Sequence, residues 1–352
     1  HRTPFFQTIP TPVHLQTACQ MLNARIVKGN GNCHSTDGTR EFDIRHQETM
    51  KLNALPRSFL LAVIPLWGFL PGLWGQNQMP IRFVDVAAEA GVTLLNVSGG
   101  PRKDFILTVA GSGAAFFDYD NDRDMDLLLV NGSTFENLRR GGDPLLVLYL
   151  NNGNGKFSDV TQPSGLHKKG WGMGVCVADY DNDGFQDFYL TTYGTNVLFR
   201  NNANGTFTDV TQQAGVGGAF HWSTNCSFSD YDRDGDVDLY VANYATQDEK
   251  TTPRPGLSPF CRYQGMDVAC GPLGLPGEPD VFYNNNSDGT FTDVTDEAGI
   301  HDPGYYGYGV ISGDLNSDGW PDLYVANDQN PNFLFRNNQN KTFTEIAVQV
   351  GA

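Results

Sequence analysis

DYDNDGFQDFYL, residues 179–190, has the form D-x-D-x-D-G-x-x-D followed by an alternating strand pattern. Its four acidic side chains fall within nine residues: Asp179, Asp181, Asp183 and Asp187. Two carboxylates about 5 Å apart repel by roughly 3 kcal/mol at an effective dielectric of ~20. Several such pairs would rival the ~5–15 kcal/mol stability of a whole domain. The spacing therefore predicts a cation at the centre of the loop.

Calcium is the cation that suits this loop. It takes six to eight oxygen ligands at ~2.3–2.6 Å, and alternate residues of a tight loop supply them. Gly184 allows the chain to turn sharply, as the central glycine of an EF-hand loop does. The loop is not an EF-hand, because that loop closes with a Glu at position twelve between two helices. Here position twelve is Leu190 inside a strand pattern, and Asp187 closes the loop at position nine.

The same loop occurs four times in the chain. DYDNDRDMD begins at residue 118, DYDRDGDVD at residue 230 and DLNSDGWPD at residue 314. The side-chain ligands predicted in these three loops are Asp118, Asp120, Asp122, Asp126, Asp230, Asp232, Asp234, Asp238, Asp314, Asn316, Asp318 and Asp322. By analogy with position seven of the EF-hand, the seventh residue of each loop is expected to add its main-chain carbonyl. These seventh residues are Asp124, Phe185, Asp236 and Trp320.

The first loop departs from the others, because Arg123 stands where they have glycine. A non-glycine residue at positive φ costs about 1–2 kcal/mol. A cationic side chain beside the site would also compete with calcium. We therefore expect the first site to be the weakest. The alternative interpretation is that all four loops are only polar hairpin turns.

The overall composition is consistent with four acidic loops as the main source of negative charge. The 352 residues carry a formal net charge of −17 and are 39% apolar, as expected of a soluble protein with ample material for a core. The four loops contain five, four, five and three Asp residues, so the acidity is local. Four calcium ions would contribute +8. The sequence has no basic run, which argues against nucleic acid or an anionic membrane as a partner.

The N-terminal part has two expected segments. Residues 1–49 begin at His1 and show no sustained period, and we interpret them as upstream sequence carried into the open reading frame or as a disordered extension, with a small accessory element as the alternative. Residues 50–76 place Lys51 and Arg57 ahead of an apolar run, which is typical of a signal peptide. An uncleaved membrane anchor is the alternative. Export suits calcium, which is plentiful outside cells, so a secreted, extracellular or periplasmic location is expected.

From residue 81 onwards the chain repeats a unit of four strand-like pieces. In the second unit these are GMGVCVAD (172–179), DFYLTT (187–192), LFRNNANG (198–205) and FTDVTQQAGV (207–216). Asn-Gly and Asp-Gly pairs between the last two pieces are hairpin turns. Four antiparallel strands per unit, repeated radially, predict an all-β fold made of β-propeller blades.

The spacing of the units predicts their number and one insertion. The loops start at residues 118, 179, 230 and 314, so the third interval holds some 30 extra residues, at about 245–278. One orphan outer strand at 81–92 and four full units predict an open arc of four blades from a larger ring. In an exported chain Cys261 and Cys270 are expected to form a local disulfide, with free thiols as the alternative. Cys176 and Cys226 lie in core strands and are expected to be small buried hydrophobes.

The loop, with G-x-G before it and DLYVAN after it, resembles the FG-GAP or VCBS repeat of integrin α-subunit propellers. The insertion, FCRYQGMDVACGPLGLPGEPDVFYNNNSDGTFTDVT at 260–295, is similar to the cartilage acidic protein family, which also carries an ASPIC/UnbV domain. The resemblance covers residues 81–352. The sequence does not include the family's C-terminal ASPIC/UnbV domain, so we expect a truncated chain. The resemblance implies an exported, calcium-bound propeller that serves in binding or cell adhesion.

Motifs for catalysis are weak. GSGAA at 111–115 mimics part of a dinucleotide fingerprint, but an Asp loop follows where a helix should begin. Neither H-E-x-x-H nor G-x-S-x-G occurs in the sequence. We therefore expect a non-catalytic module. The rival hypotheses are a secreted polysaccharide lyase or quinone-dependent dehydrogenase on a propeller scaffold, and a passive spacer for a missing C-terminal domain.

Three aromatic residues bear on the partner. Trp171, Trp222 and Tyr306 each stand eight residues before a loop's first Asp, and Ala110 holds this position in the first unit. If the strand they begin lines a central channel, they would offer a stacking surface for a sugar or a peptide. Packing between blades is the favoured interpretation. The expected partner is an unidentified protein or carbohydrate ligand.

Overall fold

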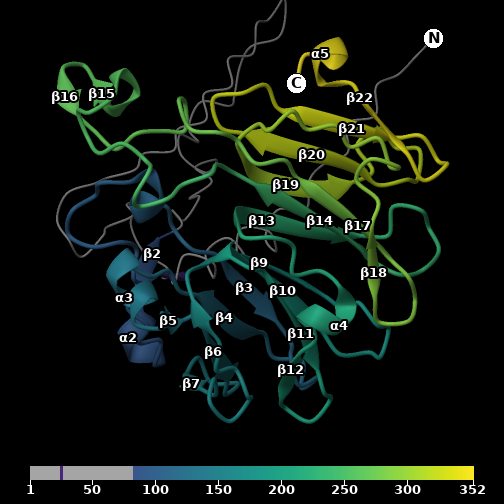
Figure 1. Cartoon of the computed structure of the whole chain (residues 1–352). Coiled ribbons are helices and arrows are strands. Elements are labelled where there is room, and N and C mark those ends of the chain that lie inside the picture. Colours follow the sequence, from purple (N-terminus) through teal and green to yellow (C-terminus); the bar gives the residue numbers. More distant parts are fainter. Residues whose placement is uncertain (1–23, 27–81) are drawn as a thin grey trace, which may run out of the picture. The chain divides into compact units, whose positions relative to one another are not determined.

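The structure is a computed structural model that describes residues 24–26 and 82–352 (Figure 1). The extension expected at 1–49, apart from β1 (Ala24–Ile26), and the signal peptide expected at 50–76 lie outside the described residues. The chain divides into two compact units, His1–Ala87 and Ala88–Ala352. In the first unit, β1 pairs antiparallel with β2 (Phe83–Asp85). The expected outer strand therefore pairs with β1 in this structure.

The second unit contains four blades, each a meander of four antiparallel strands in chain order. The first blade consists of β3 (Ala114–Phe117), β4 (Asp126–Val130), β6 (Leu146–Asn151) and β7 (Phe157–Asp159). The second consists of β9 (Gly172–Ala178), β10 (Asp187–Gly194), β11 (Val197–Asn201) and β12 (Phe207–Asp209). The third consists of β13 (His221–Ser229), β14 (Asp238–Asn243), β17 (Val281–Asn285) and β18 (Phe291–Asp293). The fourth consists of β19 (Gly307–Gly313), β20 (Asp322–Asn327), β21 (Phe333–Asn337) and β22 (Phe343–Glu345).

Short elements connect and decorate the blades. The helices are α2 (Ala87–Ala90), α3 (Phe135–Arg139), α4 (Thr211–Ala214), α5 (Ala347–Val350) and the 3-10 turns η1 (Ile106–Val109) and η2 (Pro259–Cys261). Two-residue strands pair as β5 (Asp143–Pro144) with β8 (Lys169–Gly170), and β15 (Arg262–Tyr263) with β16 (Met266–Asp267). None of the helices within the described ranges has the length and apolar character that a membrane span requires.

The first strands of successive blades, β3, β9, β13 and β19, follow one another in space (Figure 1). The G-x-G pattern explains how closely they approach. A Cβ atom on Gly174 would lie 2.5 Å from the Thr224 carbonyl oxygen of β13, and one on Gly307 would lie 2.7 Å from an Asp280 carboxylate oxygen. Within the described part of the chain, the strand pairings do not join the fourth blade to the first. The four blades thus form an arc, which confirms the predicted partial propeller.

The hydrophobic core lies between neighbouring blades. Leu128 and Leu148 of the first blade pack against Phe188 and Leu190 of the second. Equivalent clusters join the second blade to the third and the third to the fourth. The alternation of apolar and polar residues along each strand directs one set of side chains into these interfaces. Each blade therefore depends on its neighbour for burial of its apolar face.

The cysteines form two disulfides in the described ranges. Cys261 pairs with Cys270 inside the insertion, as predicted. Cys176 pairs with Cys226, so the prediction that these were simply small buried hydrophobes was wrong. These two residues lie on β9 and β13, the first strands of adjacent blades, with Cα atoms 5.7 Å apart. That separation lies in the range that a disulfide requires. The sequence does not reveal the register between blades that creates it.

Candidate metal centres

The first aspartate of each loop folds the loop around its own carboxylate. Asp179 accepts hydrogen bonds from the backbone N–H groups of Asp183 at 3.0 Å and Gly184 at 2.8 Å. The other three loops make the same pair of bonds to Asp118, Asp230 and Asp314. The fifth residue then accepts from the N–H of the seventh, as Asp183 does from Phe185. Local hydrogen bonding therefore prearranges the acidic side chains.

The backbone turns twice through the left-handed region in each loop. The sixth residue has positive φ, and Arg123 adopts φ 76° where Gly184 adopts φ 88°. The strain expected at Arg123 is therefore present. The fourth residue also has positive φ, a feature that the sequence analysis missed: Asn121, Asn182, Arg233 and Ser317. Asparagine at two of these positions was the available signal, since it tolerates this conformation better than most residues.

Three of the loops bring three carboxylates together. In each, one oxygen per residue lies within 4.8 Å of the others. The three groups are Asp118, Asp120 and Asp122; Asp179, Asp181 and Asp187; and Asp230, Asp232 and Asp234. In the fourth loop an amide, Asn316, holds position three, and its Nδ2 donates to Asp318 at 3.0 Å. The arrangement suits a hard divalent cation, which prefers clustered oxygen ligands.

The ninth residue of each loop is buried and ties the loop to its blade. Asp187 is fully buried and accepts from the N–H of Tyr180 at 3.1 Å and of Asn201 at 2.7 Å. Asp126, Asp238 and Asp322 make equivalent pairs of bonds. The carboxylate thus holds the loop against the third strand of its own blade. Each oxygen retains a second lone pair that a cation can use.

Burial and neighbouring acids alter the ionisation of these loops. Burial raises the pKa of Asp187 to about 8, with repulsion from Asp181 and Asp183 adding to it. Burial likewise raises the pKa of Asp238 to about 8 and that of Asp126 to about 6. A nearby positive charge would favour the ionised form of Asp187 and Asp238 at neutral pH. A cation in these loops would therefore offset the cost of burying the carboxylate.

The third residue of the loops shows the same excess of negative charge. Asp181 Oδ1 is buried and lacks a hydrogen-bond partner. Its counterpart Asp232 has a fully buried side chain, and Lys341 Nζ reaches within 2.5 Å of its Oδ2 as an ion pair. Lys341 comes from the hairpin between β21 and β22 of the next blade. In the third loop a lysine thus provides part of the positive charge.

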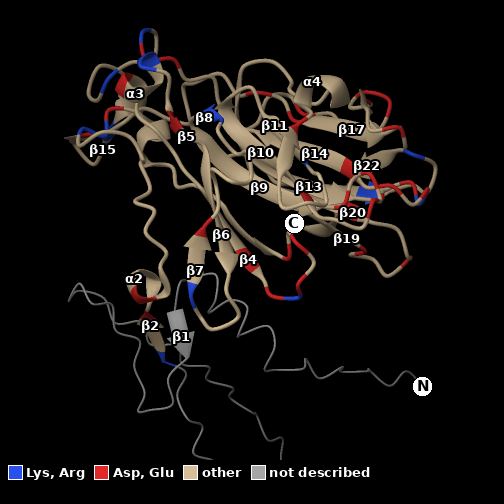
Figure 2. Ribbon diagram, turned by 90° about the horizontal axis from the view of Figure 1, so that it is seen from below, with Lys and Arg blue, Asp and Glu red and all other residues tan. Residues whose placement is uncertain are grey.

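The loops are joined to one another along the arc. Asn121 Nδ2 donates to the Gly184 carbonyl at 2.9 Å, and Asn182 Nδ2 donates to the Gly235 carbonyl at 3.2 Å. The Arg233 guanidinium lies over the Trp320 ring at 5.2 Å. Acidic residues accordingly gather in loops at the strand ends of the blades (Figure 2). A cation in one loop would therefore act on its neighbours.

A second set of bonds runs from each blade to the loop of the preceding blade. Asn201 Nδ2 donates to the Tyr119 carbonyl, Asn285 Nδ2 to Tyr180 and Asn337 Nδ2 to Tyr231. All three asparagines are at most 3% exposed. The sequence analysis missed them, although an Asn-Asn pair recurs in every unit as their signal.

The aromatic residues singled out in the sequence lie away from the loops, at the other end of the first strands. Trp171, Trp222 and Tyr306 are 1%, 1% and 8% exposed and share one apolar cluster, which confirms packing as their main role. Trp222 packs edge-on against Tyr244 with ring centroids 4.7 Å apart. Residues 111–113 lead into strand β3 without a helix, as expected for a spurious dinucleotide motif.

Comparison with known families accounts for this repeated loop. A family model described as an FG-GAP-like repeat matches residues 118–190, 179–241, 265–325 and 314–352. The chain belongs to the FG-GAP-like repeat family. Each FG-GAP match begins at or before an acidic loop, and the matches together cover all four loops described above. The resemblance inferred from the sequence is thereby confirmed.

Curated relatives of this FG-GAP protein are similar over most of its length. Cartilage acidic protein 1 of Mus musculus is 25% identical over 328 residues, which cover 79% of this chain and 48% of the relative. Cartilage acidic protein 1 of Homo sapiens is 24% identical over 332 residues, which cover 79% of this chain and 47% of the relative. The chain thus spans about half the length of the curated relatives it matches.

Among the solved structures that are similar is a lectin of Agrocybe aegerita, described in terms of specific recognition of non-reducing terminal N-acetylglucosamine. The TM-score is 0.28 and the sequence identity 14%, over 66% of this chain and 64% of the lectin.

Proposed function

We propose that this chain is a calcium-binding, secreted β-propeller that acts as a non-catalytic binding or adhesion module. The observation that carries the proposal is the recurrence of three carboxylate clusters at the same place in successive blades. A cation at these clusters would offset the repulsion among the carboxylates and the cost of burying Asp187 in the second loop. Membership of the FG-GAP-like repeat family supports the same conclusion.

Each loop would hold its ion through the residues that the spacing indicates. In the second loop these are Asp179, Asp181, Asp183 and Asp187 with the carbonyl of Phe185. The other loops would use their counterparts, with Asn316 supplying an amide oxygen in the fourth. Calcium would stabilise the ionised form of the ninth residue, whose pKa burial otherwise raises. Bonds between loops would pass that stabilisation along the arc.

Secretion is the second part of the proposal. Two disulfides in the described ranges suit an oxidising compartment, since such bonds are rare in the cytosol. The relatives' name, cartilage acidic protein, points to an extracellular setting for them. The signal peptide proposed at residues 50–76 would provide the route. In this setting millimolar calcium is enough for loops of modest affinity.

Thermal unfolding of the purified chain with calcium and with a chelator tests the metal sites. A ligand that binds only the folded state at a hundred times its Kd stabilises by about 2.7 kcal/mol per site. The melting temperature is expected to rise markedly in calcium and less in magnesium. The matched variant Asp181→Asn removes one charge from the second cluster and should reduce the calcium-dependent rise. Identical melting curves in calcium and in chelator would refute the proposal.

A further inference from the structure

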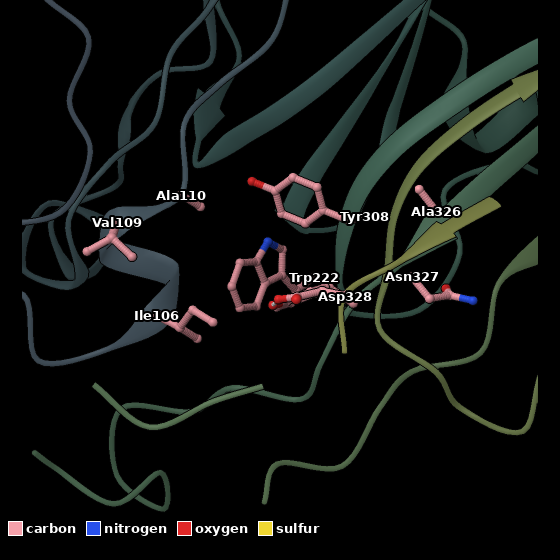
Figure 3. A pocket seen from close by; sticks show the side chains of 9 residues that line it. Ile106, Val109, Ala110, Trp222, Tyr308, Ala326, Asn327 and Asp328 are labelled. Carbon is pink, nitrogen blue, oxygen red and sulfur yellow. Dashed lines mark hydrogen bonds between the residues drawn. The ribbon is translucent and has the colours of Figure 1, made fainter. Parts of the chain in front are cut away.

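A cavity of about 410 Å³ lies where β13, β19 and β20 meet the turn η1 (Figure 3). Its volume is within the ~300–1,000 Å³ typical of small-molecule sites. Val109 of η1 forms part of one wall, and Tyr308 of β19 lies on the other side of the Trp222 ring (Figure 3). The cavity lies at the opposite end of β13 from the acidic loop, since its aromatic residue Trp222 lies at the start of β13 and Asp230 follows the end of that strand.

The wall of the cavity offers an accessible aromatic face. Tyr308 is 53% exposed, although its ring is held edge-on against Tyr244 with centroids 5.7 Å apart. Tyr244 is itself buried and packs against Trp222. An exposed ring fixed by buried rings is a preorganised surface, because little side-chain freedom remains to be lost on binding.

One buried polar group of the cavity lacks a partner within the protein. Trp222 is 1% exposed, and its Nε1 has no hydrogen-bond acceptor. Figure 3 shows this nitrogen on the edge of the indole that faces Tyr308. Asn327 also lines the cavity, but its amide points away from Trp222, and its Nδ2 donates to the Pro331 carbonyl at 2.8 Å (Figure 3). A buried indole N–H is costly when unpaired, so its presence indicates an occupant with a hydrogen-bond acceptor.

A second polar group is already oriented. Asp328 lines the same cavity, and its Oδ2 accepts the Tyr244 hydroxyl at 2.6 Å. Its other oxygen remains available as an acceptor. The cavity therefore combines one donor, one acceptor and an aromatic face.

This combination distinguishes between ligand classes. A hydroxyl group both donates and accepts, so hydroxyls can accept from Trp222 Nε1 and donate to Asp328. A sugar ring adds an edge of C–H groups that packs on the electron-rich face of a phenol ring. A quaternary ammonium would use the aromatic face but give the indole N–H no acceptor. A purely apolar ligand would leave every polar group unpaired.

We propose that this cavity binds a neutral saccharide residue, packed on Tyr308 and hydrogen-bonded to Trp222 and Asp328. The inference rests on the proposed binding function and gives it a ligand class and a site. It does not require the saccharide to contact calcium.

Saturation-transfer NMR on the full chain in calcium tests the site. The probes are the methyl glycosides of glucose, galactose, mannose, fucose and N-acetylglucosamine, with tetramethylammonium, which has no hydroxyl, as the ammonium probe. We expect at least one glycoside to bind and tetramethylammonium not to bind. Tyr308→Ala should weaken that glycoside about tenfold, while Tyr308→Phe, which keeps the aromatic face, should stay within about threefold.

Tyr263→Ala is the matched control, because Tyr263 is 61% exposed and lies in the insertion rather than at the cavity. It should bind as the unaltered chain does. Equal binding by Tyr308→Ala, no transfer to any glycoside, or binding of tetramethylammonium instead would overturn the proposal. Melting curves of the same samples with calcium and with chelator report the metal sites separately. A failure of one proposal is therefore distinguishable from a failure of the other.

Discussion

Replacement of Lys341 by methionine tests the electrostatics of the third loop. Lys341 Nζ lies within 2.5 Å of Asp232 Oδ2, and the Asp232 side chain is fully buried while that of Lys341 is 62% exposed. Solvent at the lysine screens the pair, so we place its contribution at about 1–3 kcal/mol, below the cost of breaking a fully buried pair. Lys341→Met should therefore destabilise the calcium-free protein by about 1–3 kcal/mol.

The effect should disappear in calcium. A bound ion takes over the charge of Asp232, so the lysine then contributes little and instead competes with the metal. A change that destabilises only the calcium-free state must tighten calcium binding by the same free energy, which is about tenfold for 1.4 kcal/mol. In a chain of this size, 1 kcal/mol corresponds to about 1–2 °C in melting temperature. The calcium-dependent rise in melting temperature should increase accordingly.

Thermal unfolding and calorimetric calcium titration measure both effects. The control is Lys156→Met, which removes the same charge from a hairpin lysine whose Nζ donates to the Glu89 carbonyl, outside any loop. That variant should leave the calcium-dependent rise unchanged. If Lys341→Met lowered the melting temperature equally with and without calcium, or weakened calcium binding, the ion pair would not compete with the metal and the argument would fail.

Three further predictions concern the loops. Burial raises the pKa of Asp187 to about 8 from an ordinary value of 3.8, so without calcium the folded protein binds more protons than the unfolded chain. The melting temperature in chelator should therefore fall as the pH rises from about 4 to 8. Calcium should flatten this slope, and a slope unchanged by calcium would contradict the prediction. Asn285→Ala leaves the Tyr180 carbonyl unpaired and should lower the free energy of unfolding in urea by about 1–3 kcal/mol. Asn286→Ala, at an exposed position, should lower it by less than half of that. Equal losses would show that the hydrogen bond between blades does not stabilise the fold. Arg123→Gly removes the strain of a non-glycine residue at φ 76° and also removes a positive charge beside the first loop. It should stabilise the calcium-bound protein by about 1 kcal/mol and strengthen the weakest calcium-binding step. No gain in stability would show that Arg123 is unstrained.

The sequence predicted what short-range spacing determines. The acidic loops, the four-strand meander and the hairpin turns each arise within one unit, and the structure confirms the blades. The turn at Arg123 was predictable because the neighbouring repeats show glycine at its position. The local disulfide between Cys261 and Cys270 was predictable for the same reason, since only nine residues separate the two.

What the sequence did not reveal are the contacts between units. Cys176 meets Cys226, and Lys341 meets Asp232, only because neighbouring blades pack at a fixed register. No local period encodes that register; it follows from side-chain volumes and from close glycine contacts such as that of Gly174 with β13. The cavity was hidden likewise, because it combines η1 with strand ends from the third and fourth blades.

The loops and the cavity lie at opposite ends of the same strand. Trp222 and Asp230 are eight residues apart along β13, which in an extended strand is about 26 Å. A calcium ion held at Asp230 is therefore too far away to touch a ligand beside Trp222. Screening would also remove most direct electrostatic influence over that distance, since the Debye length at physiological salt is about 8 Å. Calcium can thus affect the cavity only by stabilising the packing of β13 against its neighbours. At temperatures well below melting, removal of calcium should leave glycoside affinity nearly unchanged, and a large loss there would indicate that the two ends are coupled through the blade.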